Sequence, residues 1–240
     1  MLALTAAVAA AGVAAGWTLR AVIFRYAVPA GDPPRRDCPA CGSPVARPWP
    51  LPAGCAGCGS WLPPRVGAVE AATGALTGIL AARIHPWPLL AAACWLALCM
   101  IPLAVIDARV RRLPDVLTFP AWAGTVAILV LAAEQEGQWG NLGRALAGGA
   151  AALAGFWLVR IVAGRHGPGA GDVKLAASLG TLLAWAGWQE LVSGFLAGLL
   201  LFAVFGTVLL LAGIVRRDQR LALGPFLISG AFLAFLLAAP

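Results

Sequence analysis

The stretch PLLAAACWLALCMIPLAVID, residues 88–107, decides the fold class of this chain. It carries no charged residue before Asp107, and its length matches the roughly 20 apolar residues that a helix needs to cross a bilayer. An acidic side chain at the end of such a stretch is costly to bury and is a functional candidate by default. The stretch therefore predicts a membrane-spanning helix and a first candidate site residue.

The rest of the chain repeats this apolar pattern. The hydrophobic content is 61%, the mean hydropathy is +0.86, and the charged residues make up 11%, roughly half the share in a soluble domain. We predict an all-α, polytopic helical membrane protein with about eight transmembrane helices. Their expected ranges are 1–24, 66–84, 88–107, 116–133, 142–163, 173–188, 190–215 and 221–239.

The basic residues predict the orientation in the membrane. Met1 to Trp17 carries no charge while Arg20 and Arg25 follow it, which is the reverse of a signal peptide and favours an uncleaved first helix with its N-terminus outside. This topology places 15 of the 17 Lys and Arg residues on the cytoplasmic side, in accord with the positive-inside rule. We therefore expect a multi-pass membrane protein with this orientation. The net charge of +7 is dispersed among loops, so we expect no nucleic-acid partner.

Residues 25–65 form the one sizeable extramembrane segment, expected in the cytoplasm between a first helix (1–24) and a seven-helix membrane core (66–240). Two Cys-x-x-Cys pairs lie in it, and their four thiolates suit a closed, structural zinc site. The ligands are Cys38, Cys41, Cys55 and Cys58. The alternative is a set of surface thiols without a full metal site. A disulfide framework is disfavoured in the reducing cytoplasm.

The predicted topology brings two distant acids to one membrane level. Asp107 ends a helix that runs from outside to inside, and Asp172 opens a helix that runs back. Two adjacent carboxylates share a proton, so that one can deprotonate a water while the other polarises a peptide carbonyl. The alternatives are that Asp172 is a helix N-cap, or that the acids form an ion relay.

Glycines precede Asp172 at Gly167, Gly169 and Gly171. Glycine permits unusual dihedral angles and close backbone approach, so an extended substrate segment could lie along this loop; the alternative is a flexible hinge.

Three further charged residues are supporting candidates. Asp115 precedes the fourth helix, and we expect it to cap that helix. Lys174 either pairs with a carboxylate or serves only as a topology determinant. Glu70, near the start of the second helix, either pairs with Arg65 or faces a cavity.

Together these residues resemble the type IV prepilin peptidase family of Gly-x-Gly-Asp aspartic proteases. Asp107 is followed by Leu-Pro-Asp-Val-Leu-Thr at 113–118, and Gly169 to Leu175 reads Gly-Ala-Gly-Asp-Val-Lys-Leu. The cysteine pairs, the stretch that follows them and Gly-Pro-Phe-Leu at 224–227 resemble further family elements. The resemblance covers nearly the whole chain.

The resemblance implies an endopeptidase of the bacterial cytoplasmic (inner) membrane that cuts the basic leader from prepilins or pseudopilins at the cytoplasmic membrane face. Asp107 and Asp172 would be its catalytic pair, and membrane lipids would surround it. Many family members then methylate the new N-terminus with S-adenosylmethionine. Here only Gly42 to Gly54 separate the cysteine pairs, a shorter stretch than in bifunctional members, and TLRAVIFRY matches the family's first-helix element poorly. The sequence indicates no oligomeric state.

Two other hypotheses assign the chain to a functional class other than peptidases. The first is a proton-coupled membrane transporter that uses the same buried aspartates as relays. The second is a non-catalytic assembly factor whose cysteine segment docks a partner.

Overall fold

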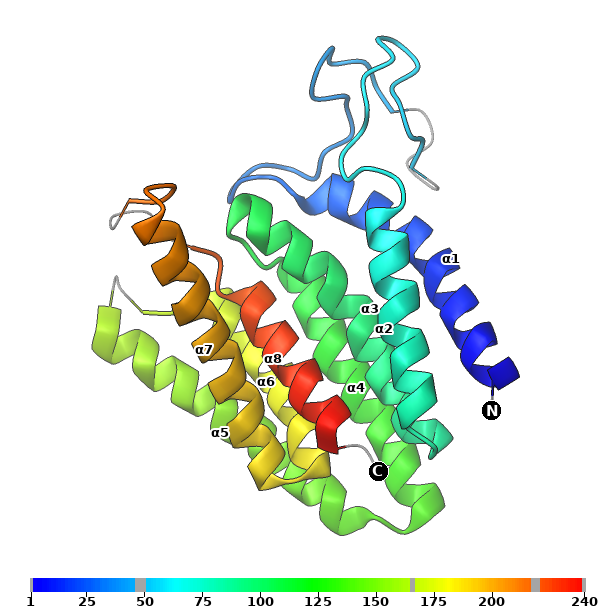
Figure 1. Ribbon diagram of the computed structural model, residues 1–240, viewed down its shortest axis with the longest axis vertical. Coiled ribbons are helices and arrows are strands. Elements are labelled where there is room, and N and C mark those ends of the chain that lie inside the picture. Colours follow the sequence, from blue (N-terminus) through cyan, green and yellow to red (C-terminus); the bar gives the residue numbers. More distant parts are fainter. Residues whose placement is uncertain (1, 46–50, 165–166, 217–220, 239–240) are drawn as a thin grey trace.

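The computed structural model describes residues 2–45, 51–164, 167–216 and 221–238, and these ranges contain eight α-helices (Figure 1). The helices are α1 (Leu2–Tyr26), α2 (Ala68–Arg83), α3 (Trp87–Val110), α4 (Asp115–Glu136), α5 (Trp139–Ala163), α6 (Ala170–Ala186), α7 (Trp188–Leu211) and α8 (Gly224–Ala238). The all-α prediction is confirmed, and each predicted helix has its counterpart. The predicted ends at residues 1 and 239 lie outside the described ranges.

Two of the predicted boundaries were wrong in a way that matters for the site. Helix α3 continues beyond Asp107 to Val110 and ends where Arg111 takes a left-handed conformation, with φ 53°. Helix α6 begins at Ala170 rather than after Asp172. Both aspartates therefore lie within helical turns, where the backbone fixes their direction.

Successive helices run in opposite directions. The cysteine segment, residues 25–65, lies at one end of the bundle, beside the end of α1 and the start of α2 (Figure 1). We call this the cysteine end. Because the helices alternate, α3 ends at the cysteine end, and α4, α6 and α8 begin there. This arrangement brings Asp107, Asp172 and Gly224 to the same end of the bundle.

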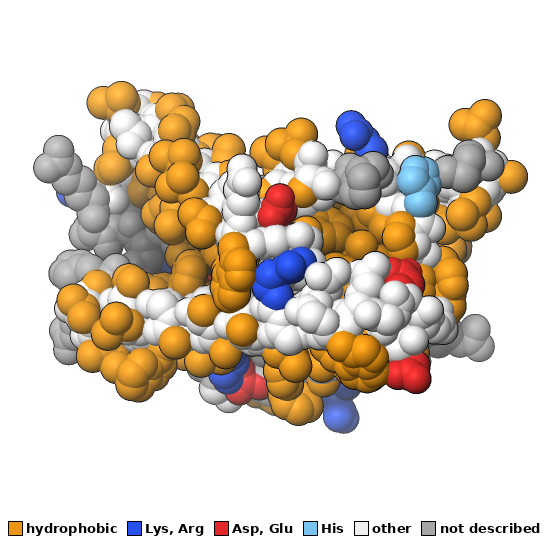
Figure 2. All heavy atoms as spheres, turned by 90° about the horizontal axis from the view of Figure 1, so that it is seen from below, with side chains coloured by type: hydrophobic (Ala, Val, Ile, Leu, Met, Phe, Trp, Pro, Cys, Tyr) orange, Lys and Arg blue, Asp and Glu red, His pale blue; other side chains and the backbone are white. Residues whose placement is uncertain are grey.

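The protein is a membrane protein. Helices α1, α3, α4, α5 and α7 are long and apolar enough to cross a bilayer. The remaining three have 15 to 17 residues, and α6 is the most enclosed, with 13 of its 17 residues buried by its neighbours. Viewed from the end opposite the cysteine segment, hydrophobic side chains cover most of the surface and charged groups are few (Figure 2).

Small residues bring the backbones of paired helices into contact. A Cβ atom on Gly16 of α1 would lie 2.6 Å from the Cα atom of Glu70 on α2, and one on Gly198 of α7 would lie 2.9 Å from the Cα atom of Leu227 on α8. In a membrane the hydrophobic effect does not drive helices together, and small residues such as glycine allow the close packing that holds them instead. The α1–α2 contact sets which residues of the two helices face each other.

The cysteine segment has its own small core, which it shares with α1. Ala21 and Phe24 from the last turns of α1 pack with Cys38, Cys55 and Leu62. The guanidinium of Arg35 lies over the Phe24 ring, 5.5 Å from its centroid. The segment is thus anchored on the end of the first helix.

Candidate active site and tetracysteine site

The four cysteines of the segment converge on one point. All four Sγ atoms lie within 4.8 Å of one another, with 3.9 Å between Cys38 and Cys58 and 3.6 Å between Cys41 and Cys55. A tetrahedral ion with Zn–S bonds of about 2.3 Å would hold its sulfur ligands about 3.8 Å apart. All six cysteines of the chain are free thiols. The cluster could therefore hold a metal ion, as the spacing predicted.

Both halves of the cluster have the same local design, Cys-x-x-Cys-Gly-Ser. In each half the N–H of the glycine donates to the carbonyl of the first cysteine, and Gly42 and Gly59 both have φ near 70°. A left-handed conformation of this kind favours glycine. The two glycines close the turns that aim the thiols inward.

The sequence analysis did not identify the two serines of this repeat as functional residues. Their equivalent positions, directly after Gly42 and Gly59, could have indicated a shared role. Ser43 Oγ lies 3.1 Å from Cys41 Sγ, and Ser60 Oγ lies 3.0 Å from Cys58 Sγ. The Ser60 hydroxyl, with backbone N–H groups, lowers the pKa of the Cys38 thiol to about 6. Likewise Ser43 lowers the pKa of Cys41. These hydrogen bonds favour the thiolates of Cys38 and Cys41, whereas burial and the neighbouring Cys41 and Cys38 thiols raise the pKa of Cys55.

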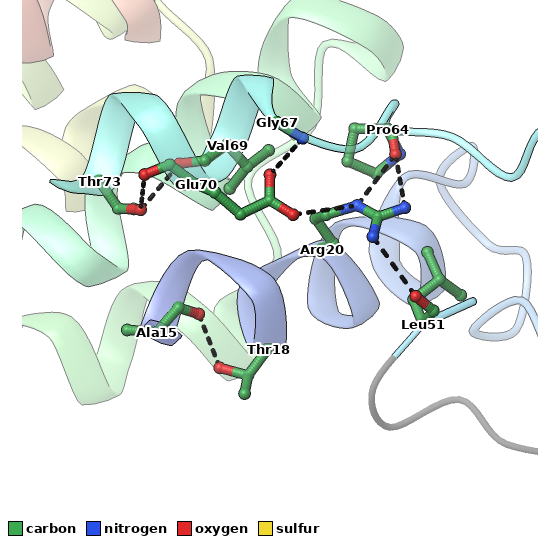
Figure 3. Close-up of polar contacts among 9 residues, drawn as sticks. All are labelled: Ala15, Thr18, Arg20, Leu51, Pro64, Gly67, Val69, Glu70 and Thr73. Carbon is green, nitrogen blue, oxygen red and sulfur yellow. Dashed lines mark hydrogen bonds and ion pairs between the residues drawn. The ribbon is translucent and has the colours of Figure 1, made fainter. Parts of the chain in front are cut away.

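A buried arginine ties α1, α2 and the cysteine segment together (Figure 3). Arg20 is 1% exposed, and its Nε lies 3.7 Å from Glu70 Oε1. Its guanidinium also donates to the carbonyls of Pro64 and Leu51. Glu70 Oε2 accepts the N–H of Gly67 at 2.9 Å. Glu70 pairs with Arg20 rather than with Arg65, which was one of its two expected alternatives, because α1 packs closely enough on α2 for Arg20 to reach the carboxylate.

Asp107 lies in the last turns of α3 and is 5% exposed. Its Oδ2 accepts the N–H of Gly224, the first residue of α8, at 3.0 Å. A helix N-terminus carries partial positive charge, which favours a carboxylate there. The sequence had singled out Gly-Pro-Phe-Leu at 224–227 but not this role; the structure places its glycine directly on the aspartate.

Asp172 is the third residue of α6 and is 9% exposed. Its Oδ2 accepts the N–H of Gly169 at 2.8 Å, so it does cap its helix, although from inside the first turn. Its Oδ1 is buried without a hydrogen-bond partner among the described residues. A buried carboxylate oxygen that lacks a partner is available for a substrate, a water or a proton.

The two aspartates are close enough for the charge of Asp172 to act on Asp107. Arg160, at the end of α5, acts on Asp172 from a distance, while its Nη1 donates to the carbonyl of Pro168 at 3.1 Å. Among the described residues no cation forms an ion pair with either aspartate. Two neighbouring buried carboxylates without a direct counter-charge form an arrangement suited to acid–base chemistry.

The glycines before Asp172 act by close packing rather than by unusual dihedral angles. Gly169 has φ −65° and ψ 160°, which any residue can adopt. A Cβ atom on Gly171 would lie 2.6 Å from Cβ of Leu113, and one on Gly167 would lie 3.0 Å from Cα of Arg160. Gly171 therefore lets the connection between α3 and α4 pack against the start of α6, which sets the spacing of the two aspartates.

Asp115 and Lys174 pair with each other at the edge of this region. Lys174 Nζ donates to Asp115 Oδ1 at 2.6 Å, and both side chains are substantially exposed. The expectation that Asp115 caps α4 with its side chain was wrong, because α4 starts at Asp115 with Pro114 as N-cap and no side-chain cap bond. Of the two alternatives expected for Lys174, the structure shows the pairing with a carboxylate.

The Asp115–Lys174 pair borders a cleft of about 520 Å³ between α4, α5 and α6. Its other walls are Thr118, Phe119, Trp122, Leu153 and Ala177. Apart from the ion pair and one threonine these side chains are apolar. The cleft therefore suits an apolar segment.

Comparison with known proteins places this arrangement in a family. Residues 91–239 match the type IV leader peptidase family. The chain is 32% identical to a prepilin leader peptidase/N-methyltransferase of Burkholderia pseudomallei, over 82% of this chain and 65% of that protein. Proteins with the same description from Aeromonas salmonicida and Pseudomonas aeruginosa are also 32% identical, over 85% of this chain and 71% of theirs. No solved structure matches the chain.

The chain thus belongs to the type IV leader peptidase family. It spans slightly less than two thirds of the length of the Burkholderia relative. The family match includes α3, α6 and α8, which carry Asp107, Asp172 and Gly224.

Proposed function

We propose that this chain is a membrane aspartic endopeptidase that cuts the leader peptide from type IV prepilins or pseudopilins. The observation that carries the proposal is the pair of buried carboxylates, Asp107 and Asp172, which lie together at the cysteine end of a leader-peptidase fold. The descriptions of the relatives support the substrate class.

The chemistry follows from a proton shared by the pair. One carboxylate removes a proton from a water, and the protonated partner donates a hydrogen bond to the scissile carbonyl. The hydroxide adds to the carbonyl carbon, and the proton then passes to the leaving amine as the C–N bond breaks. The backbone N–H groups of Gly224 and Gly169 hold the carboxylates in place during these steps. The unpartnered Oδ1 of Asp172 is the atom we assign to the water.

The position of the aspartates supports cleavage at a membrane boundary. Both lie within about one turn of a helix end, at the end of the bundle that carries the cysteine segment. We propose that this end faces the cytoplasm and that the N-terminus lies outside, because the positive-inside rule favours that orientation. A reporter fused before Leu2 should be accessible from outside intact cells, and one inserted after Gly31 should not.

The apolar cleft beside the Asp115–Lys174 pair suits the hydrophobic helix that follows the leader of a prepilin. We propose that this helix lies against Phe119 and Trp122 while its leader crosses the aspartates. A disulfide between a cysteine introduced at Trp122 and cysteines placed along the prepilin helix would map the contact. Exclusive crosslinking elsewhere would contradict this placement.

The test of the catalytic pair uses three purified variants and a prepilin substrate. Asp107→Asn and Asp172→Asn should each lower leader removal, followed by mass spectrometry, by about 10³-fold or more, as for loss of an acid–base group. Asp32→Asn is the matched control, because it makes the same chemical change at an exposed residue that lines neither cleft. Cleavage near wild-type rates by either of the first two would end the proposal.

We further propose that the ion in the tetracysteine cluster is structural zinc and that residues 25–65 form a folded unit which braces α1 and α2. Four thiolates leave no open coordination position, so the ion would contribute to folding rather than to catalysis. Elemental analysis should give one zinc per chain, and Cys41→Ser should lower it. Cys94→Ser, on a helix of the membrane bundle, is the control.

Methylation of the mature N-terminus is a second candidate activity, supported by the descriptions of the relatives. Its methyl donor would be S-adenosylmethionine, which carries positive sulfonium and ammonium groups. The cleft beside the cysteine segment is lined by Arg65 and Arg109 without an acidic residue, so it suits the carboxylate of this donor but offers no counter-charge to the sulfonium and ammonium groups. We assign no residue to this step. Transfer of a labelled methyl group to mature pilin, measured with the Asp107→Asn variant and precut pilin, would test it separately from cleavage.

The hypotheses of a transporter and of an assembly factor gain no support from the family. Substrate flux in proteoliposomes without peptide cleavage would favour the first. Partner binding that is lost on deletion of 35–60 and unaffected by the aspartates would favour the second.

A further inference from the structure

A second cleft of about 520 Å³ lies between the cysteine segment and helices α2 and α3, apart from the aspartates. The proline-rich end of the segment forms its rim, with Trp61 68% exposed. Ala72 of α2 and Ile101 and Val105 of α3 form its floor. Arg65 and Arg109 complete the lining. The cleft thus combines an apolar floor with two guanidinium groups.

The charges of this cleft are unbalanced. No acidic residue lines it, and within the described part of the chain neither Arg65 nor Arg109 has a hydrogen-bond or ion-pair partner. Glu70, the third residue of α2, already pairs with Arg20 and accepts the N–H of Gly67. The positive charge of Arg35 also acts on Arg109. Two unpaired arginines in one cleft favour an anion, and guanidinium groups suit phosphate.

In this cleft the charged residues lie at the end of the bundle and the apolar residues lie deeper along α3, as the head group and acyl chains of a membrane would require. Arg65 precedes α2 and Arg109 lies in the last turn of α3, so both are at the cysteine end. Ile101 and Val105 precede Arg109 at intervals of four residues, so all three lie on one face of α3. Ile101 is therefore about 12 Å deeper than Arg109 along the helix. Trp61 at the rim is of the residue type enriched at membrane interfaces.

We propose that this cleft binds an anionic phospholipid. Its phosphate would lie between Arg65 and Arg109, and the first part of one acyl chain would lie along Val105 and Ile101. The lipid would fill the space between the cysteine segment and the membrane helices. The proposal depends on the membrane placement of the helices and is independent of the peptidase function.

The test is lipid retention by the purified protein, measured by native mass spectrometry with phosphatidylglycerol or phosphatidylcholine added to the detergent. The wild type should retain one phosphatidylglycerol and little phosphatidylcholine. The double variant Arg65→Gln/Arg109→Gln should bind phosphatidylglycerol about 30-fold more weakly, since each arginine near an anionic lipid contributes roughly a factor of five. The matched control Arg36→Gln/Arg83→Gln removes the same charge outside the cleft and should bind like the wild type.

A second variant tests the apolar floor. Val105→Trp keeps both arginines but occupies the acyl-chain path, so phosphatidylglycerol retention should fall while weak binding of inorganic phosphate persists. This variant also decides the question if the double arginine variant fails to fold. Equal retention by both double variants, equal retention of the two lipids, an unaffected Val105→Trp, or displacement of the lipid by S-adenosylmethionine would each overturn the proposal.

Discussion

Three buried carboxylates lie near the cysteine end of the bundle, and their surroundings differ. Glu70 has the guanidinium of Arg20 at 3.7 Å and the N–H of Gly67 at 2.9 Å. Asp107 and Asp172 each accept a hydrogen bond from one backbone N–H, and within the described ranges neither forms an ion pair. Glu70 is therefore compensated by a cation, whereas the two aspartates face each other's charge.

This difference shows what separates a structural buried acid from a reactive one. A buried carboxylate paired with an arginine holds its two helices together. Removal of either partner leaves the other charge buried without compensation, which destabilises the fold. A carboxylate held only by a backbone N–H keeps its remaining lone pairs for chemistry. We therefore expect substitutions at Glu70 to affect stability and substitutions at the aspartates to affect activity.

The largest effect should come from the aspartates. Asp172→Asn keeps the shape and removes the charge, so cleavage should fall by about 10³-fold or more. The thermal unfolding midpoint should stay the same or rise, because a buried charge without a counter-ion is lost. Mass spectrometry of the leader and a thermal scan of the same preparation measure both. A large drop in the midpoint would place Asp172 with Glu70 as a structural acid.

The next largest effect should come from loss of the cation that pairs with Glu70. Arg20→Met leaves Glu70 buried without its cation and should cost about 3 kcal/mol of unfolding free energy. The double variant Arg20→Met/Glu70→Met should recover most of this loss. Cleavage per folded molecule should change by less than about twofold, because among the described residues neither Arg20 nor Glu70 forms a hydrogen bond or ion pair with the aspartates. If the double variant is as unstable as the single one, the ion pair is not what stabilises the junction.

Sequence reasoning found the helices and brought the aspartates to the same end of the bundle, and both results have a simple cause. Long apolar stretches define the helices, and antiparallel helices alternate direction, so the depth of Asp107 and Asp172 follows from the order of the stretches. The cysteine cluster was equally accessible, because four thiols in two short turns constrain each other.

The partners of these residues could not be predicted, because they depend on how helices are rotated and how closely they pack. Sequence spacing offered Glu70 either Arg65, five residues away, or a cavity, but the glycines of α1 bring Arg20 to it instead. Similarly, the N–H of Gly224 reaches Asp107 across 117 positions of sequence. Tertiary packing sets such contacts, and the spacing of residues along the sequence does not reveal them.

A smaller effect should follow from loss of the backbone support for Asp107. A Cβ atom on Gly224 would lie 2.7 Å from Oδ2 of Asp107, so Gly224→Ala should displace the carboxylate and weaken its hydrogen bond. Since a hydrogen bond to a charged group contributes about 1.5–3 kcal/mol, cleavage should fall by about 10- to 100-fold. Gly155→Ala is the control, because a Cβ atom there meets nothing within 4 Å. Equal activities of the two variants would show that Gly224 does not position Asp107.

The smallest effect should be at the exposed ion pair. Asp115 and Lys174 lie 2.6 Å apart, but their side chains are 72% and 48% exposed, so water and salt screen their attraction. Lys174→Met should therefore cost less than about 1 kcal/mol of unfolding free energy. Cleavage of a prepilin should change by no more than about fivefold, the rate equivalent of that energy. A loss comparable to that of Asp172→Asn would mean that Lys174 acts on the catalytic pair, and that the exposed ion pair belongs with the reactive acids rather than with the surface.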